Sequence, residues 1–95
     1  MLAELLQKAI EMGADRLEIE YENGMELVTA FSGPMGIGIG SVDSTHRDSF
    51  FQELKQMKKS KRAKVGGQNY RLSFSTYESF GETVYQVGWK QCPSS

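Results

Sequence analysis

The sequence predicts an α+β fold, a mostly antiparallel sheet of five or six strands with two helices. Apolar residues alternate with glutamates over 16–22, the period of a strand with one buried face, and Asn23-Gly24 follows as a tight turn. Apolar residues recur at helical spacing over 2–12 and 45–59. The links between neighbouring strands are too short for crossovers. We therefore expect the order α-β-β-β-α-β-β-β, with both helices on one face of the sheet.

The first helix is expected over 2–12, where leucines, Ala9 and Ile10 fall on one stripe. Gly13 is placed to end it with a left-handed cap. The first strand then occupies about 16–22. The chain is short enough for one domain, 1–95, with 91–95 as a frayed tail.

The strand expected over 25–32 has two possible registers. A two-residue loop sets Ile19 opposite Val28 and leaves Leu27 and Phe31 on the glutamate face. A three-residue loop with a glycine bulge shifts the pairing by one and turns Leu27 and Phe31 inward. We expect the second register because it buries the larger side chains. The first register would leave an apolar stripe on the outer face that needs a partner.

A glycine-rich strand over 36–42 follows the turn at 32–36, and its alternate glycines allow another backbone or a helix to approach closely. The second helix is expected from about 45 to 59, opened by a capping box of Thr45 and Asp48.

Three strands complete the chain, at about 62–65, 69–76 and 82–90, with turns at Gly66-Gly67 and at 77–81. Alternation predicts two core faces in the last hairpin. One is made of Tyr70, Leu72 and Phe74, and the other of Thr83, Tyr85, Val87 and Trp89.

Composition limits the compartment and the partners. A net charge of −1 provides no global attraction to nucleic acid or to an anionic membrane. The single cysteine, Cys92, excludes an intrachain disulfide and favours a reducing, cytoplasmic setting. No apolar run approaches the roughly 20 residues of a membrane span, and the charged amino end is unlike a signal peptide, so we expect no membrane insertion.

Charge is nevertheless unevenly distributed. Residues 1–26 are rich in glutamate, whereas 47–71 are rich in lysine and arginine. The candidate partner-binding residues are Lys55, Lys58, Lys59, Lys61, Arg62, Lys64 and Arg71. Three interpretations stay open for this basic segment: a solvated helix end that suits the helix dipole, a surface for an acidic protein partner, and a nucleic-acid site centred on 55–64.

The sequence predicts no enzyme, no cofactor and no metal site. The run Gly36-Ile-Gly-Ile-Gly40 lacks the Gly-Lys-Ser/Thr of a phosphate loop and is expected to be a packed strand. His46 and Cys92 have no second ligand or base at a recognised spacing. The glutamates at 18, 20 and 22 lie on one exposed strand face, which protects an edge and does not form a catalytic cleft.

Residues 9–20, 27–35 and 71–73 with Gly81-Glu82 together resemble the N-terminal domain of the type II secretion and type IV pilus ATPases. Residues 9–20 occupy the place of that family's Ala-x-x-x-Gly-Ala-Ser-Asp-Ile-His-Ile-Glu, residues 27–35 that of Val-Arg-x-Arg-Ile-Asp-Gly-x-Leu, and 71–73 with Gly81-Glu82 that of its closing segment. The resemblance spans about 3–90. The family's His is Glu18 here, its two arginines are Val28 and Ala30, its Asp is Ser32, and the motor domain has no counterpart.

The resemblance implies a PAS-like sheet and an assembly role beside a secretion or pilus motor, because such domains sit on neighbouring subunits of a ring. We therefore expect a non-catalytic docking or regulatory module that binds another protein or a second copy of itself. Two alternatives stay open, a nucleic-acid-binding protein and a PAS-like sensor of a small molecule.

Overall fold

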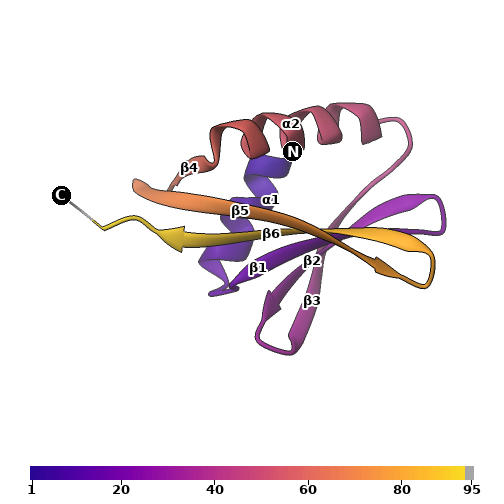
Figure 1. Ribbon diagram of the computed structural model, residues 1–95, viewed down its shortest axis with the longest axis horizontal. Helices are drawn as coiled ribbons and strands as arrows, with labels where there is room; N and C mark the ends of the chain where they lie inside the picture. The colour runs from indigo at the N-terminus through magenta and orange to yellow at the C-terminus, as the bar shows by residue number, and fades with distance from the viewer. Residues whose placement is uncertain (94–95) are drawn as a thin grey trace.

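Two α-helices pack on one face of a six-stranded antiparallel sheet in the computed structural model, which describes residues 1–93 (Figure 1). The elements are α1 (Leu2–Glu11), β1 (Arg16–Glu22), β2 (Met25–Ser32), β3 (Met35–Val42), α2 (Arg47–Ser60), β4 (Arg62–Val65), β5 (Gln68–Ser79) and β6 (Glu82–Gln91). The strands lie in the order β3-β2-β1-β6-β5-β4. The first and last strands are therefore neighbours in the middle of the sheet. The expected α+β class, with two helices and an antiparallel sheet, is confirmed.

The sheet has two different faces, which we call inner and outer. The inner face points toward the helices and forms one hydrophobic core with them, whereas the outer face is covered by neither helix. Every strand except β3 contributes alternate residues to the core, as the period of a strand requires. The buried core residues are Leu2, Leu6, Ala9, Ala14, Leu17, Ile19, Val28, Ala30, Ile39, Val42, Phe50, Leu54, Leu72 and Val87.

The register that we expected for β2 is wrong. Asn23 and Gly24 form a two-residue turn with positive φ at both positions, and this turn pairs Ile19 with Val28. Val28 is fully buried on the inner face, whereas Leu27 is half-buried on the outer face, directly opposite Glu20. The paired positive φ angles match the twist of the hairpin. Turn geometry therefore outweighs the larger apolar area of Leu27 and Phe31.

The glycines of β3 accommodate side chains on both faces of the sheet. A β-bulge opposite Val28 and Thr29 leaves Ile39 as the extra residue, buried toward the helices. Gly40 then also faces inward, where a Cβ atom would lie 2.9 Å from Leu5 of α1. The absence of a side chain at position 40 therefore lets α1 pack directly on the edge of the sheet.

The start of α2 is held differently from the expected capping box. His46 is the N-cap residue and makes no side-chain cap, and the His46 amide donates instead to the Asp43 carboxylate at 3.1 Å. Arg47 forms an ion pair with Glu26 at 3.1 Å. Glu26 is only 3% exposed, so the pair attaches the first turn of α2 to β2.

The last hairpin is longer than the sequence predicts. β5 continues to Ser79, and only Phe80 and Gly81 form the turn, with positive φ at both positions. The expected core residues of β5 and β6 pack toward the helices except Thr83, which is exposed and donates to Glu78 at 2.9 Å. At the other end, β6 reaches Gln91, and the Cys92 amide donates to the Asn69 carbonyl at 2.7 Å. Strand pairing therefore extends into the segment 91–95 that was expected to be a frayed tail. Residues 94–95 of that segment lie outside the described residues.

The register of β2 can be tested by placing a lysine at each of two adjacent positions. Val28→Lys buries an ammonium group in the core and is expected to reduce the free energy of unfolding by about 3 kcal/mol or more. Leu27→Lys places the same group beside Glu20 on the outer face, with an expected loss of about 1 kcal/mol or less. Urea unfolding of both variants provides the comparison. Equal losses, or a larger loss at position 27, would contradict the observed register.

Candidate basic interface

The outer face carries an uninterrupted row of cations across three strands. Arg62 of β4 lies directly opposite Arg71 of β5, and Arg71 lies directly opposite Lys90 of β6. All three side chains are exposed. Within residues 1–93 none of them forms an ion pair. We call these three residues the cationic row.

Such a row destabilises the folded sheet. Like charges directly opposite each other on neighbouring strands repel, and the repulsion is of the order of a few tenths of a kcal/mol per pair. Lys64, one alternate position along β4, adds a fourth cation to the outer face opposite Asn69. These cations form no ion pair among residues 1–93, and the nearby Asp15 carboxylate is bonded to Arg16, so the positive surface is available to an external anionic group.

A hollow of about 610 Å³ adjoins the row on the outer face. Its central lining consists of small side chains, Ser73, Ser75 and Gly88, and at position 88 a Cβ atom would lie only 2.8 Å from the Ser73 hydroxyl. Arg71 and Lys90 line the hollow together with these residues. The Ser75 hydroxyl donates to Gln86, so the arrangement places the Ser73 hydroxyl beside two cations, which is a suitable environment for carboxylate groups.

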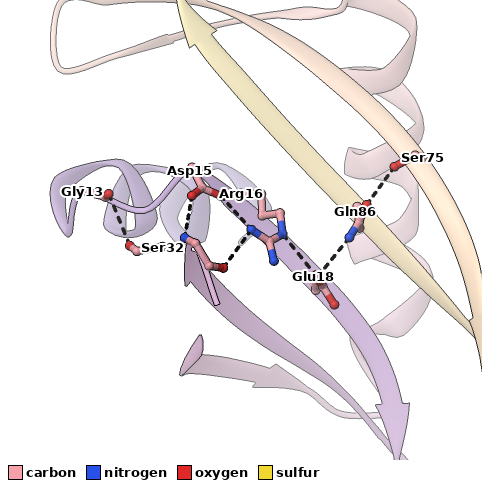
Figure 2. Close-up of polar contacts among 8 residues, drawn as sticks. Gly13, Asp15, Arg16, Glu18, Ser32, Ser75 and Gln86 are labelled. Atoms are coloured by element: carbon pink, nitrogen blue, oxygen red, sulfur yellow. Dashed lines mark hydrogen bonds and ion pairs between the residues drawn. The ribbon is translucent and has the colours of Figure 1, made fainter. Parts of the chain in front are cut away.

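Arg16 also lines the hollow, but its charge is already balanced. The guanidinium donates to Asp15 at 2.9 Å, to the Gly33 carbonyl at 3.2 Å and to Glu18 at 3.4 Å (Figure 2). The Phe31 ring lies under it, 4.6 Å from the guanidinium carbon. The Gly33 amide and then Arg16 lower the pKa of Asp15, so this carboxylate stays ionised. Arg16 is therefore a structural cation and differs from the unpaired cationic row.

Glu18 is a buried carboxylate on the same face, and it accepts three hydrogen bonds. The donors are the Tyr77 hydroxyl at 2.6 Å, the Gln86 amide at 3.0 Å and Arg16. Gln86 in turn accepts from Ser75, and Figure 2 shows the bonds made by Arg16, Gln86 and Ser75. The network connects β5, β6 and β1 across the outer face. It explains how Glu18 is only 9% exposed on a face without helices. Sequence reasoning placed Glu18 on an exposed strand face, so this burial is a correction.

The structure divides the predicted partner-binding residues between two surfaces. Arg62, Lys64 and Arg71 share the outer face. Lys55 and Lys58 lie on α2, where they line a separate groove between the helix and the sheet. Lys59 is exposed near the end of the helix, and Lys61 is its left-handed C-cap residue.

Lys90 belongs to the cationic row and was missed by sequence reasoning. It lies outside the basic segment in sequence, and only the register of the last hairpin brings it opposite Arg71. The signal was alternation, because Lys90 follows the inward-facing Trp89 and must therefore point outward.

Other kinds of site find little support in residues 1–93. No group of three or more His, Cys, Asp or Glu side chains is placed to hold a metal ion. His46 is exposed, with Nδ1 2.9 Å from Asp43, and Cys92 is a half-buried free thiol. No helix among the described residues is both long and apolar enough to span a membrane.

Neither the models of known protein families nor the curated proteins provided a match to this chain.

The repulsion in the cationic row predicts a stabilising substitution. Arg71→Gln removes the central charge and is expected to raise the free energy of unfolding by up to about 0.5 kcal/mol at low ionic strength. The gain should shrink in 1 M salt, where charges are screened beyond about 3 Å. Urea unfolding at both salt concentrations measures this gain in stability. Lys59→Gln, which removes an exposed charge outside the row, is the control. An unchanged or lower stability at low salt would show that the row is not repulsive.

The bond between Tyr77 and Glu18 predicts a loss of stability in alkaline solution. Hydrogen bonding to Glu18, followed by desolvation, raises the pKa of Tyr77 above its ordinary value of 10.0. Because the pKa of Tyr77 is raised in the folded state, the bond contributes fully to the free energy of unfolding below about pH 10. This stabilisation is lost as the pH rises through the folded-state pKa. Tyr77→Phe is expected to cost about 1 kcal/mol at pH 7.

Urea unfolding of the two proteins between pH 7 and pH 11.5 tests this contribution. The difference in the free energy of unfolding between the unmodified protein and Tyr77→Phe should stay constant to about pH 10 and narrow above it. Tyr21→Phe is the control, since no hydrogen bond holds the Tyr21 hydroxyl within the described residues. A difference that does not change with pH would contradict the role of Glu18.

Proposed function

We propose that this protein is a non-catalytic docking or regulatory module that binds an acidic segment of another protein through the outer face of its sheet. The observation that carries the proposal is the cationic row of Arg62, Arg71 and Lys90, held in register across three strands without counter-charges in the described chain. A charged row of this kind costs stability, and binding to carboxylates compensates for that cost.

The acidic partner is favoured over nucleic acid by the placement of the aromatic residues. Single-stranded nucleic acid is bound by stacking on aromatic rings beside the positive charge. Of the aromatic residues closest to the row in the hairpin, Tyr70 and Phe74 pack toward the helices, and Trp89 packs against the core although it also lines the hollow. Tyr77 faces outward, but its hydroxyl is bonded to Glu18. Glu20 and Glu22 on the same outer face would also repel a long polyanion.

The arrangement of the strands supports the finer assignment of a PAS-like sheet. The first and last strands are central, each is flanked by its hairpin partner, and both helices lie on one face. Together with the resemblance to secretion and pilus ATPase N-terminal domains, this suggests a motor component of such a system as the partner. A second copy of the chain offers similar chemistry through the glutamates of β1.

Charge reversal in two matched triple variants tests the docking proposal. Arg62→Glu/Arg71→Glu/Lys90→Glu removes the cationic row, and Lys55→Glu/Lys58→Glu/Lys59→Glu makes the same change in net charge on α2. Each tagged chain is used to capture proteins from native lysate with and without nuclease treatment, and the captured proteins are then identified. We expect the outer-face variant to lose roughly tenfold or more of the captured partner. The α2 variant should keep it.

Three outcomes would overturn the proposal. Capture that disappears after nuclease treatment would indicate nucleic acid as the ligand. Equal capture by the two variants would show that the cationic row is not the binding surface. A failure to capture any protein, with no salt-dependent self-association in sedimentation, would leave the row without an acidic partner.

A further inference from the structure

A second, chemically different site lies on the inner side of the molecule, between α2 and the β5–β6 hairpin. It is a groove of about 400 Å³, within the usual size range of small-molecule pockets. We call it the α2 groove. Its main lining residues are Phe51, Leu54, Lys55 and Lys58 from the helix and Phe74, Thr76 and Tyr85 from the sheet.

The groove has an apolar lining that the core does not fully cover. Phe51, Phe74 and Tyr85 are each only half-buried, although all three pack against the core. The Phe51 and Tyr85 rings meet edge to face, with centroids 5.4 Å apart. Aromatic surface of this kind is favourable for an apolar group that displaces water from it.

Two lysines place positive charge beside this lining. Lys55 and Lys58 are three residues apart on α2, so they lie on the same side of the helix, and both line the groove. Both are exposed, and neither forms an ion pair within the described part of the chain. An anionic group in the groove would therefore meet two cations without displacing a carboxylate.

We propose that the α2 groove binds a small amphipathic anion, a carboxylate with an alkyl or aryl body. The apolar body lies against Phe51, Phe74 and Tyr85, and the carboxylate reaches the ammonium groups of Lys55 and Lys58. A neutral apolar molecule would leave the two charges unused, and a compact inorganic anion would leave the aromatic surface exposed. The ligand class follows from having both features in one groove. The proposal is independent of docking on the outer face.

Octanoate and benzoate serve as probes, with octanol as the uncharged control. Amide chemical shifts of the isotope-labelled protein report where each probe binds. We expect octanoate, benzoate or both to shift the amides of 51–58, 74–76 and 85, while those of Arg62, Arg71 and Lys90 stay unchanged. Lys55→Gln/Lys58→Gln should weaken carboxylate binding about five- to tenfold and leave octanol binding unchanged.

Two further variants distinguish the groove from general attraction to positive charge. Thr76→Trp fills the groove with an indole and should abolish binding of both carboxylates. Lys59→Gln/Lys61→Gln removes the same number of charges from the last turn and C-cap of α2, outside the groove, and should leave binding unchanged. Shifts centred on the cationic row, equal weakening by the two lysine pairs, or no shift at millimolar concentrations of either carboxylate would overturn the proposal.

Discussion

The two-residue turn at Asn23-Gly24 determines which side of the sheet each residue of β2 occupies, and the remaining structure depends on that choice. With Val28 on the inner face, β2 contributes only small and medium side chains, Val28 and Ala30, to the core, and β3 needs a bulge to keep Ile39 inside. Phe31 is then left on the outer face, where the guanidinium of Arg16 stacks on its ring. A local turn preference of the backbone thus creates both a core and an outer surface.

The outer face is stabilised at one end and left charged at the other. Around Glu18, three donors satisfy a buried carboxylate, and Arg16 is balanced by two acidic neighbours. Buried polar groups that are fully bonded make such a network rigid. On β4 to β6 the cations have no such partners among the described residues. The contrast within one face is the physical reason to regard Arg71 and its neighbours as an interface.

Local patterns predicted the elements well, because periodicity and turn residues act over a few positions. The bounds of β1, β2 and β4 agree with the alternation and glycine signals. Features that depend on how the strands pair were not predictable from periodicity alone. The register of β2 depended on whether burial or turn geometry prevailed, and Lys90 lies opposite Arg71 only through the register of the last hairpin. Glu18 is buried only because Tyr77 reaches it from β5. The α2 groove depends on how closely the helix approaches the sheet, which no sequence pattern states.

The basic segment illustrates how one run of charges can serve two surfaces. Lys55 and Lys58 follow the helical period of α2 and face the groove, whereas Arg62 follows the strand period of β4 and faces outward. The change of period occurs at Lys61, where the left-handed C-cap ends the helix and the carbonyl accepts from Leu72 at 3.0 Å. Neutralising the whole run at once would alter both surfaces together. Because the two surfaces differ in chemistry, one polar and one aromatic, we expect different ligands for them, and only substitutions chosen by face can separate the two.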